Sequence, residues 1–389
     1  KKDAKGKTII NALNLETLEY ELAISPKLEI VKSAKGIGLM NKRLNYLVDG
    51  NSKEQKFFKD YFATLLEYSA SRVPEISDQY YPLDDAMRSG YVWDYGPFEY
   101  WDLLGFDKGI ELIKSKGGSV PKWIIDMKES GGNSFYKFEN GQKKYFNIQS
   151  KKYEFLPGRE SFIILDSYRE NTPVLKNSEC EVHDIGDGVL CLEFTSKSNS
   201  IGEGIGKGLY EIIEIAERGD WNGLVIGNNA KQFSVGANLM NIGMLAMQKQ
   251  FNVLEKFVSD FQKINMRIRT CKIPVVVATQ GYVFGGGCEI SMHCDAGIYA
   301  AESYIGLVEV GVGLLPGGGG TKEFALRASN DFFDGDVQNP TLIKYFKSIA
   351  TAAVSTSAYE AYDLGYLNKE CDFVCVNAPM NLLIAKEKV

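Results

Sequence analysis

The part of the chain that decides the fold reads Phe284-Gly285-Gly286-Gly287-Cys288-Glu289 and, further on, Leu307-Val308-Glu309-Val310-Gly311-Val312-Gly313-Leu314-Leu315-Pro316-Gly317. Each stretch places one glutamate among apolar and glycine neighbours. Because a carboxylate is costly to desolvate unless it is paired or used, Glu289 and Glu309 are candidate acid/base groups. Glycines lack a Cβ atom, so their backbone can approach a ligand closely and aim N–H groups at an oxyanion.

Strand and helix patterns alternate around these two stretches, from about Cys180 onward. Apolar runs predict strands at 189–194, 223–227, 273–278 and 295–300. Helical patterns fall between them, near 208–218 and 252–269. Continuous apolar strands that alternate with helices predict an α/β unit with a covered sheet.

The region before Cys180 has a different composition. Up to about Gly118 it is rich in Leu, Lys, Glu and aromatic residues at helical spacing, which predicts an all-helical region. Asn140-Gly141, between alternating segments, predicts a small β-hairpin. A chain of 389 residues also exceeds the usual span of one core. The predicted domains are a helical one at 1–118, a linker with the hairpin at 119–178, and an α/β domain at 179–389.

Charge and cysteine usage exclude several classes of protein. The chain carries 44 Lys+Arg against 50 Asp+Glu, so it has no basic excess that would follow a nucleic-acid backbone. Its seven cysteines are odd in number and stand mostly in apolar strings, which predicts buried, reduced thiols and a cytoplasmic location. No apolar run reaches membrane-spanning length, and the start at Lys1 is neither a signal peptide nor an initiator methionine. We expect a soluble piece of a longer protein.

Two other glycine-rich segments have the wrong spacing for nucleotide binding. The glycines of 202–208 alternate at every second position and do not give G-x-G-x-x-G, so this segment is interpreted as the flexible start of a helix. In 317–322 the threonine and lysine stand in the wrong order for a phosphate-binding loop. Neither segment predicts a nucleotide site.

The two histidines, His183 and His293, also give weak signals. A Ser-His-Asp triad would need one of them, and no G-x-S-x-G motif supports it. The group Cys288, His293 and Cys294 has the wrong spacing for a closed zinc site, so no metal is predicted. His293 is interpreted as a core or surface residue.

Taken in order, three segments resemble the signature segments of the crotonase (enoyl-CoA hydratase) superfamily: 231–239, 285–289, and Glu309 with 316–321. The two glutamates lie 309 − 289 = 20 positions apart, as in hydratases of that family. The resemblance covers about Cys180 to the end. It implies a crotonase-like spiral of ββα units, here truncated at its C-terminal end.

The resemblance also implies a role for each site residue. The backbone N–H groups of Ala237 and Gly286 correspond to the oxyanion hole of that family. Glu289 and Glu309 would hold one water, with one carboxylate accepting its proton while the other, protonated, delivers a proton to C2. Gly317 would donate its N–H to the same water. The implied substrate is an acyl-CoA thioester, with coenzyme A as part of the substrate, and the implied assembly is a homo-oligomer.

The helical part carries a second resemblance. Residues 83–102 resemble the second helical repeat of 3-hydroxyacyl-CoA dehydrogenases, although by residue type alone Gly96-Pro97 simply ends one helix and starts another. Together the resemblances imply part of a bacterial β-oxidation dehydrogenase that carries a hydratase domain at its C-terminal end. Neither a G-x-G-x-x-G motif nor the family's catalytic histidine precedes the helical repeat, so this chain is expected not to bind NAD.

Three functions remain open at this point. The first is syn hydration of 2-enoyl-CoA to 3-hydroxyacyl-CoA within a β-oxidation multienzyme. The second is 3,2-enoyl-CoA isomerisation, because a carboxylate beside an oxyanion hole can also move a proton along an allylic system. The third is a non-catalytic acyl-CoA-binding or scaffold role. In the family that the chain resembles, the presence of both glutamates favours hydration.

Overall fold

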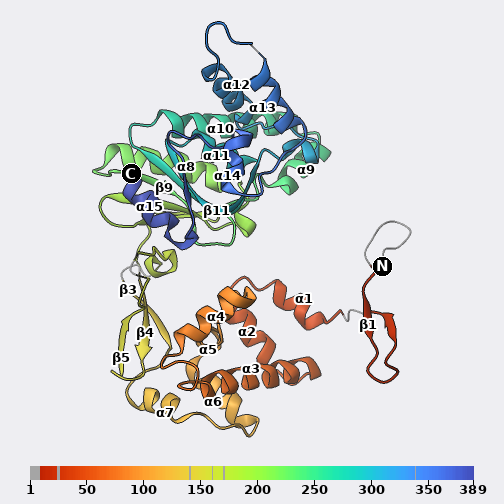
Figure 1. The fold of residues 1–389 in the computed structure, drawn as a ribbon, viewed down its shortest axis with the longest axis vertical. Coiled ribbons are helices and arrows are strands. Elements are labelled where there is room, and N and C mark those ends of the chain that lie inside the picture. Colours follow the sequence, from red (N-terminus) through yellow and green to blue (C-terminus); the bar gives the residue numbers. More distant parts are fainter. Residues whose placement is uncertain (1–8, 24–26, 140–141, 160, 170, 338) are drawn as a thin grey trace. The chain divides into compact units, whose positions relative to one another are not determined.

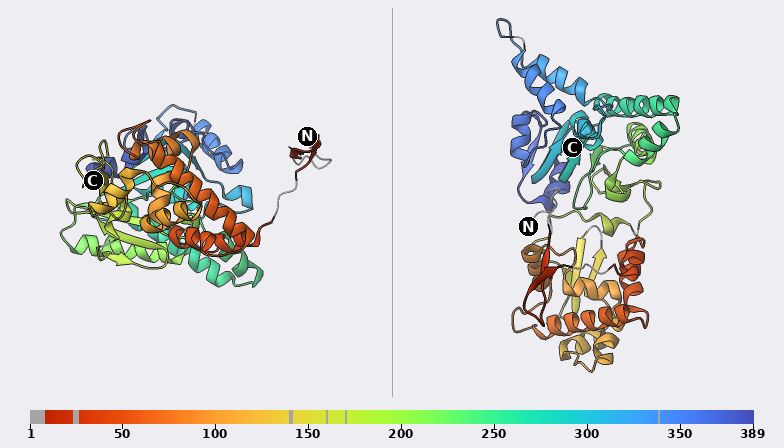
Figure 2. Two further views of the ribbon diagram at one scale, coloured as in Figure 1. Left: turned by 90° about the horizontal axis from the view of Figure 1, so that it is seen from below. Right: turned by 90° about the vertical axis from the view of Figure 1, so that its right-hand side faces the viewer.

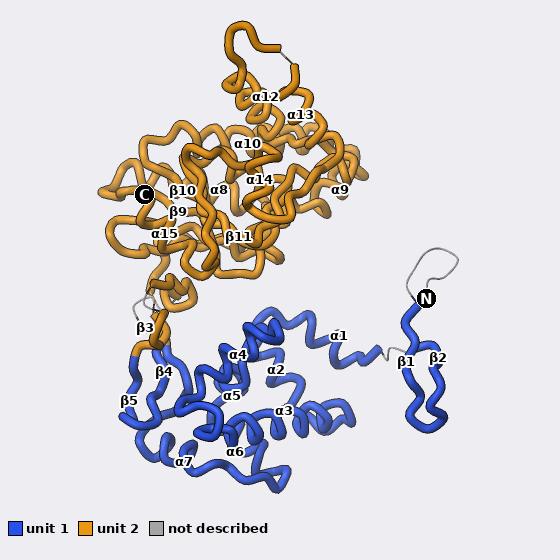
Figure 3. Tube along the Cα trace, in the orientation of Figure 1, with its two compact units in different colours: residues 1–137, 144–154 blue, residues 138–143, 155–389 orange. Residues whose placement is uncertain are grey.

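The computed structural model describes residues 9–23, 27–139, 142–159, 161–169, 171–337 and 339–389. The chain divides into two compact units (Figure 3). One comprises residues 1–137 and 144–154, and the other comprises residues 138–143 and 155–389.

The first unit is mainly helical (Figure 1). Its helices are α1 (Glu29–Lys35), α2 (Met40–Val48), α3 (Lys53–Ser71), α4 (Tyr81–Tyr91), α5 (Pro97–Leu104), α6 (Phe106–Ser115) and α7 (Lys122–Glu129). A short antiparallel pair, β1 (Asn11–Leu13) and β2 (Tyr20–Leu22), precedes them and was not predicted. Helix α7 also lies beyond Gly118, where the helical pattern was expected to end. Buried aromatic residues, among them Phe98, Trp101 and Phe135, form the core of these helices.

The predicted helix–turn–helix at Gly96-Pro97 is present, with Pro97 as the first residue of α5. The carboxylate of Asp84, in α4, is fully buried and accepts hydrogen bonds from Phe98 N (2.9 Å) and Tyr136 Oη (2.7 Å). A Cβ atom on Gly96 would lie 2.3 Å from the Asp84 side chain. The turn therefore needs glycine because the carboxylate occupies the space beside it.

A second sheet follows α7, with the order β3 (Tyr136–Glu139), β4 (Gln142–Asn147), β5 (Lys152–Phe155). Strands β3 and β4 stand at the place of the predicted hairpin. The Asn140-Gly141 turn itself lies outside the described residues. Strand β5 adds a third strand that the sequence pattern did not reveal.

The second unit is an α/β fold built on one sheet. Within the described residues its strand order is β12-β11-β10-β9-β8-β7-β6. The strands are β6 (Leu175–Lys176), β7 (Cys180–Asp184), β8 (Val189–Phe194), β9 (Gly223–Ile226), β10 (Val275–Phe284), β11 (Ala296–Gly306) and β12 (Phe373–Cys375). Strands β6 to β8 pair antiparallel, and β8 to β12 pair parallel. The α/β prediction is confirmed.

The helices of this unit connect and cover the strands. They are α8 (Glu203–Arg218), α9 (Leu239–Met247), α10 (Phe251–Thr270), α11 (Gly286–His293), α12 (Gly320–Asn330), α13 (Pro340–Ala350), α14 (Ala358–Leu364) and α15 (Asn381–Lys388), with short 3₁₀ turns such as η3 (Glu309–Val312). No helix in the described ranges has the length and apolar character that crossing a bilayer demands.

Both faces of the large sheet are covered by apolar side chains. Leu224 and Ile226 point into a cluster that includes residues of α8, α10 and α11. Val225, between them, points to the opposite face, where it meets residues of α15. Helix α15 lies against β10 and β11, as Figures 1 and 2 show in dark blue. Because alternate residues of a strand face opposite sides, these strands had to be continuously apolar.

The carboxyl ends of β10 and β11 position the candidate site. Phe284 pairs with Gly306, and Gly285 N donates to Gly306 O at 2.9 Å just beyond the last strand residues. The register between the two strands shifts between Thr279 and Gly281. Helix α11 follows β10 directly, and η3 follows β11, so both predicted glutamates emerge from the same edge of the sheet.

All cysteines of the chain lie in described segments, and each is a free thiol. Cys180, Cys191, Cys288 and Cys375 are buried, and the others are partly exposed.

Candidate active site

Glu289 lies in the first turn of α11, directly after the turn at Gly285. Gly285 precedes the helix with φ 51° and ψ −120°, a conformation that favours glycine. The side chain of Glu289 is buried, with 2% of its surface exposed. The glycine run therefore serves to turn the chain sharply from β10 into α11 and to bring a carboxylate into the interior.

Backbone N–H groups face the Glu289 carboxylate from the start of α12. Its Oε1 atom accepts a hydrogen bond from Gly320 N at 2.9 Å. Burial raises the pKa of Glu289 to about 7, while the N–H groups of Gly320, Gly318 and Gly319 oppose that rise by stabilising the charged form. The result is a carboxyl group that titrates near neutral pH.

Glu309 is the first residue of η3 and approaches the same turn from the end of β11. Its Oε1 atom lies 3.2 Å from the position that a Cβ atom would take on Gly285. Its Oε2 atom is buried and has no hydrogen-bond partner among the described residues. Burial, and then the charge of Glu289, raise the pKa of Glu309 to about 8. Two coupled carboxyls of this kind hold one proton between them near neutral pH.

The segment before α9 lies beside the end of β10. Ser234 O accepts from Phe284 N at 3.1 Å, so residues 234–236 run parallel to the last strand residues. Gly236 has φ 89°, and a Cβ atom on it would lie 2.8 Å from Phe284 O and 3.4 Å from Gly286 N. Only a glycine lets these two backbone segments come so close.

The N–H groups of Ala237 and Gly286 both have no acceptor among the described residues. Ala237 forms a parallel bridge with Ile201, in which Ile201 N donates to Gly236 O and Asn238 N donates to Ile201 O. This pattern does not use the N–H of Ala237, which has no acceptor among the described residues. The N–H of Gly286, the first in α11, likewise has no acceptor in that part of the chain and gains from the positive end of the helix dipole.

Gly317 was predicted to donate its N–H to a water between the two acids. The structure places it at the start of the turn before α12, where its carbonyl accepts from Gln262 Nε2 at 2.7 Å. The N–H groups that stabilise Glu289 belong to the next three glycines. The sequence analysis missed Gly318–Gly320, although a run of glycines ahead of a helix is the usual signal for an anion-binding backbone turn.

Phe261, in α10, is a further residue that the sequence analysis did not single out. A Cβ atom on Gly286 would lie 3.1 Å from its Cζ atom, and one on Gly318 would lie 2.3 Å from its Cε1 atom. The ring therefore lies against both glycine turns. It supplies an apolar wall that keeps the two carboxyls out of bulk water and sustains their raised pKa values.

A separate group of buried polar residues lies on β7 and β8: Glu181, His183 and Glu193, whose ligand atoms are within 4.8 Å of one another. This donor set could hold a metal ion. Arg169, however, already donates to Glu181 at 2.5 Å and to Glu193 at 2.9 Å. The carboxylates are thereby paired with a cation of the chain itself, and we interpret the group as an ion-pair cluster.

The mainly parallel sheet, the two glycine turns at its edge and the neighbouring pair Glu289 and Glu309 are together features of the crotonase class of fold. Residues 184–331 match the family model described as Enoyl-CoA hydratase/isomerase.

The relatives cover the helical region as well. A Bacillus subtilis (strain 168) protein named Probable 3-hydroxyacyl-CoA dehydrogenase is 37% identical over 386 residues, which are 98% of this chain and 48% of that protein. The Short-chain-enoyl-CoA hydratase of Clostridium acetobutylicum is 35% identical over 104 residues, 26% of this chain and 38% of the relative. A solved enoyl-CoA hydratase structure from Geobacillus kaustophilus has a TM-score of 0.45 at 23% identity, with 56% of this chain and 75% of that one covered. The chain thus spans about half the length of the Bacillus subtilis relative.

Proposed function

We propose that the second unit hydrates 2-enoyl-CoA thioesters to 3-hydroxyacyl-CoA. The observation that carries the proposal is the pair Glu289 and Glu309, whose pKa values are raised to about 7 and about 8 beside two backbone N–H groups that have no acceptor among the described residues. Near neutral pH one member of such a pair is charged and the other is protonated. Hydration needs both states at once.

The N–H groups of Ala237 and Gly286 bind the thioester carbonyl oxygen in this proposal. As water adds to C3, the C2=C3 electron pair moves toward the carbonyl and negative charge develops on that oxygen. Each N–H aimed at the developing charge is typically worth about 10²- to 10³-fold in rate. The position of Gly286 at the N-terminus of α11 adds the helix dipole to this stabilisation.

Glu289 is the base and Glu309 the acid. Glu289 has the lower of the two pKa values and is held by N–H donors, so it ionises first and takes the proton from the attacking water. The water oxygen bonds to C3 while Glu309 gives its proton to C2. The product carries OH at C3 and a new hydrogen at C2, and the pair exchanges its proton to start again. Both acids lie at one edge of the sheet, which favours delivery to one face of the alkene.

The same family model covers isomerases, in which a carboxylate moves a proton between C2 and C4 of a 3-enoyl-CoA. That reaction needs a single base beside the oxyanion hole. The unpartnered, buried Oε2 atom of Glu309 opposite the N–H-bonded Glu289 favours the two-acid reaction. We therefore place hydration first.

The remaining parts of the proposal concern the longer protein. We assign the helical unit to the dehydrogenase part of a β-oxidation multienzyme, because the alignment with the Bacillus subtilis relative runs through both units. NAD would serve the dehydrogenase activity of the longer protein. Free thiols throughout the described segments support a cytoplasmic location. A homo-oligomer is expected, and analytical ultracentrifugation of the chain tests it.

Crotonyl-CoA tests the proposed reaction directly. The chain should remove the absorbance of the conjugated thioester and yield 3-hydroxybutyryl-CoA, identified by mass spectrometry with one added water. The double variant Glu289→Gln/Glu309→Gln is the control because it keeps the shape of the site. If the unaltered chain binds crotonyl-CoA by calorimetry yet turns it over no faster than the double variant, the hydratase proposal is wrong and the non-catalytic alternative holds. Conversion of a 3-enoyl-CoA without any hydration would point to the isomerase.

A further inference from the structure

His293, at the C-terminal end of α11, is buried directly behind Glu289. Its Nδ1 atom lies 2.6 Å from the main-chain oxygen of Glu289, four residues earlier in the same helix. Since a carbonyl oxygen only accepts, Nδ1 carries the hydrogen. Burial lowers the pKa of His293 to about 4, so the ring is neutral and Nε2 is left as an acceptor.

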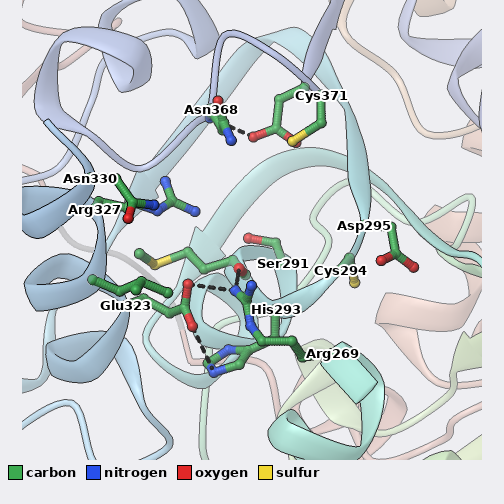
Figure 4. Close-up of a pocket in the computed structure, with 13 residues that line it drawn as sticks. Arg269, Ser291, His293, Cys294, Asp295, Glu323, Arg327, Asn330, Asn368 and Cys371 are labelled. Atoms are coloured by element: carbon green, nitrogen blue, oxygen red, sulfur yellow. Dashed lines mark hydrogen bonds and ion pairs between the residues drawn. The ribbon is translucent and has the colours of Figure 1, made fainter. Parts of the chain in front are cut away.

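Lys322, in the first turn of α12, fills that acceptor position. Its Nζ atom lies 3.0 Å from Nε2 of His293 and also bonds to Glu323. Glu323 is buried and pairs with Arg269 of α10 at 2.5 Å, and Arg269 in turn donates to Met292 O at 2.9 Å. Figure 4 shows the carboxylate of Glu323 between Arg269 and His293. The end of α11 is thereby tied to both α10 and α12.

The ring of His293 also lies against the glycine turn that stabilises Glu289. A Cβ atom on Gly319 would be 3.0 Å from its Cε1 atom and 3.1 Å from its Nε2 atom. One residue later, Gly320 N donates to the Glu289 carboxylate. A closed path of contacts thus leads from the main chain of Glu289 through His293 and the start of α12 back to the Glu289 side chain.

We propose that His293 is a positioning residue for the acid pair, which holds the Gly318–Gly320 turn against Glu289 and so sets how readily this carboxylate binds a proton. The effect of His293 on catalysis rests on the proposed function, whereas its effect on the proton affinity of Glu289 does not. His293 does not touch the reacting atoms, because its ring contacts Gly319 and its Nδ1–H bonds to the main-chain oxygen of Glu289. It acts through the three N–H groups that favour the charged form of Glu289.

The charged groups around the two residues define what else could move the titration. Glu309 faces Glu289 from η3. Lys322 and Glu323 of α12 and Arg269 of α10 face His293. These charged groups stay the same when His293 alone is replaced by an uncharged residue. The replacement also removes no charge, because the ring is neutral. A shift in the titration of Glu289 in such a variant therefore reports the loosened turn and not a lost charge.

The decisive measurement is the titration of the Glu289 carboxyl by ¹³C NMR of glutamate-labelled chain, without substrate. It is made in a Glu309→Gln background, so that a single carboxyl of the pair titrates. His293→Leu puts an apolar side chain in the place of the ring. It removes the hydrogen bonds to Glu289 O and to Lys322 Nζ. We expect it to raise the Glu289 midpoint by roughly half a pH unit or more, because fewer N–H donors then stabilise the carboxylate. His293→Asn, whose amide can still donate to Glu289 O, should give an intermediate value.

The chain contains its own matched control, because His183 is also a buried histidine of the second unit and does not contact the site. His183→Leu should leave the Glu289 midpoint unchanged. An identical midpoint in His293→Leu and in the unaltered chain would overturn the proposal. If His293→Leu does not fold, as judged by circular dichroism, His293→Asn decides the matter, because it also leaves every charge in place and removes the ring that lies against Gly319; a midpoint equal to that of the unaltered chain would then overturn the proposal.

Kinetics add the catalytic consequence and separate the two proposals. In a chain that hydrates crotonyl-CoA, His293→Leu should move the acidic limb of the kcat/KM profile upward by the same interval as the NMR midpoint, while His183→Leu leaves it in place. A limb that stays fixed while the NMR midpoint moves would overturn the link to catalysis. A chain that shows no hydration refutes the proposed function, and the NMR titration still decides the role of His293.

Discussion

The amide nitrogen of Gly286 lies 3.4 Å from the position that a Cβ atom would take on Gly236. These residues are fifty positions apart in sequence, and their contact places the segments that carry the N–H groups of Ala237 and Gly286 side by side. The proposed oxyanion hole therefore depends on a backbone contact that no side chain mediates.

Gly236→Ala should consequently disable the site. The new methyl would meet Phe284 O at 2.8 Å, and alanine is strained at φ 89°. We expect kcat for crotonyl-CoA to fall by about 10²- to 10³-fold, the value of one oxyanion donor. Gly335→Ala is the control, because Gly335 has φ 95° but open space around its Cβ position. A rate loss of equal size in both variants would show that backbone strain, and not the contact with Gly286, is responsible.

Each glutamate should be needed for hydration but not for binding. Glu289→Gln removes the proposed base and Glu309→Gln removes the proposed acid, so we expect each to lower kcat by about 10²- to 10⁴-fold. The dissociation constant for crotonyl-CoA should stay within about threefold, since neither carboxylate binds the coenzyme A part. Stopped-flow kinetics and calorimetry measure the two quantities. Retention of full activity in either variant would contradict the two-acid mechanism.

The pH profile should be bell-shaped with its maximum between about 7 and about 8. Below that interval Glu289 becomes protonated and can no longer accept a proton. Above it Glu309 loses the proton that it must deliver. The kcat/KM profile for crotonyl-CoA measures both limbs, which belong to the coupled pair. An alkaline limb that persists in Glu309→Gln would show that another group controls it.

The raised pKa of Glu289 also predicts how stability depends on pH. Between the ordinary glutamate pKa of 4.5 and the folded-state pKa of about 7, the native state binds more protons than the unfolded state. The free energy of unfolding therefore falls as pH rises through this window. In Glu289→Gln the fall between pH 5 and pH 8.5 should be smaller by on the order of 2 kcal/mol. Urea unfolding at both pH values measures it, and Glu302→Gln, an exposed glutamate of β11, should behave like the unaltered chain.

In the helical unit, Asp84 is expected to be the most sensitive polar position. Asp84→Ala would leave Phe98 N and Tyr136 Oη without this buried acceptor, at a cost of about 2 to 4 kcal/mol. Hydrogen exchange should then quicken at amides of α4 and α5 and stay unchanged in β8 to β10. Asp107→Ala, which breaks only an exposed pair with Lys128, is the control and should alter exchange little. Equal protection of α4 and α5 in both variants would refute the prediction.

The sequence could predict those parts of the site for which the residue type and its neighbours in sequence are a sufficient signal. Glycine marks the turn at Gly285, because the combination of φ 51° and ψ −120° favours glycine. A glutamate in an apolar run marks Glu289 and Glu309, and continuous apolar strands mark a covered sheet. These signals are local, so the strands, the long helix α10 and both acids could be placed without coordinates.

What the sequence could not predict depends on contacts between distant segments. The structure confirms that 202–208 starts a helix, α8, but the packing role of its glycines was not predicted. Gly208 lies inside α8, where a Cβ atom would be 2.3 Å from Cys180 Sγ, so its glycine serves close packing and not flexibility. His293 was interpreted as a core or surface residue, and the structure buries it; its contact with the Gly318–Gly320 turn could not be predicted because it exists only once α12 has packed beside α11. The pairing of β1 with β2 gave no periodic signal in so short a segment.

The register shift in the sheet has a consequence for the distance between the two acids. Before it, Val276 pairs with Ala296, an offset of 296 − 276 = 20, and after it Gly281 pairs with Ser303, an offset of 303 − 281 = 22. At the earlier offset the residue opposite Phe284 would be 304 instead of 306, and Glu309 would stand two residues, roughly 6.6 Å, further along its strand direction. Two extra residues of β11 are accommodated at the shift, and Glu309 therefore lies level with the glycine turn at Gly285. Gly281 permits this with φ 56°, where a Cβ atom would lie 2.2 Å from Lys231 O. The irregularity in the middle of these two strands thus sets how far along the sheet Glu309, the proposed proton donor, lies.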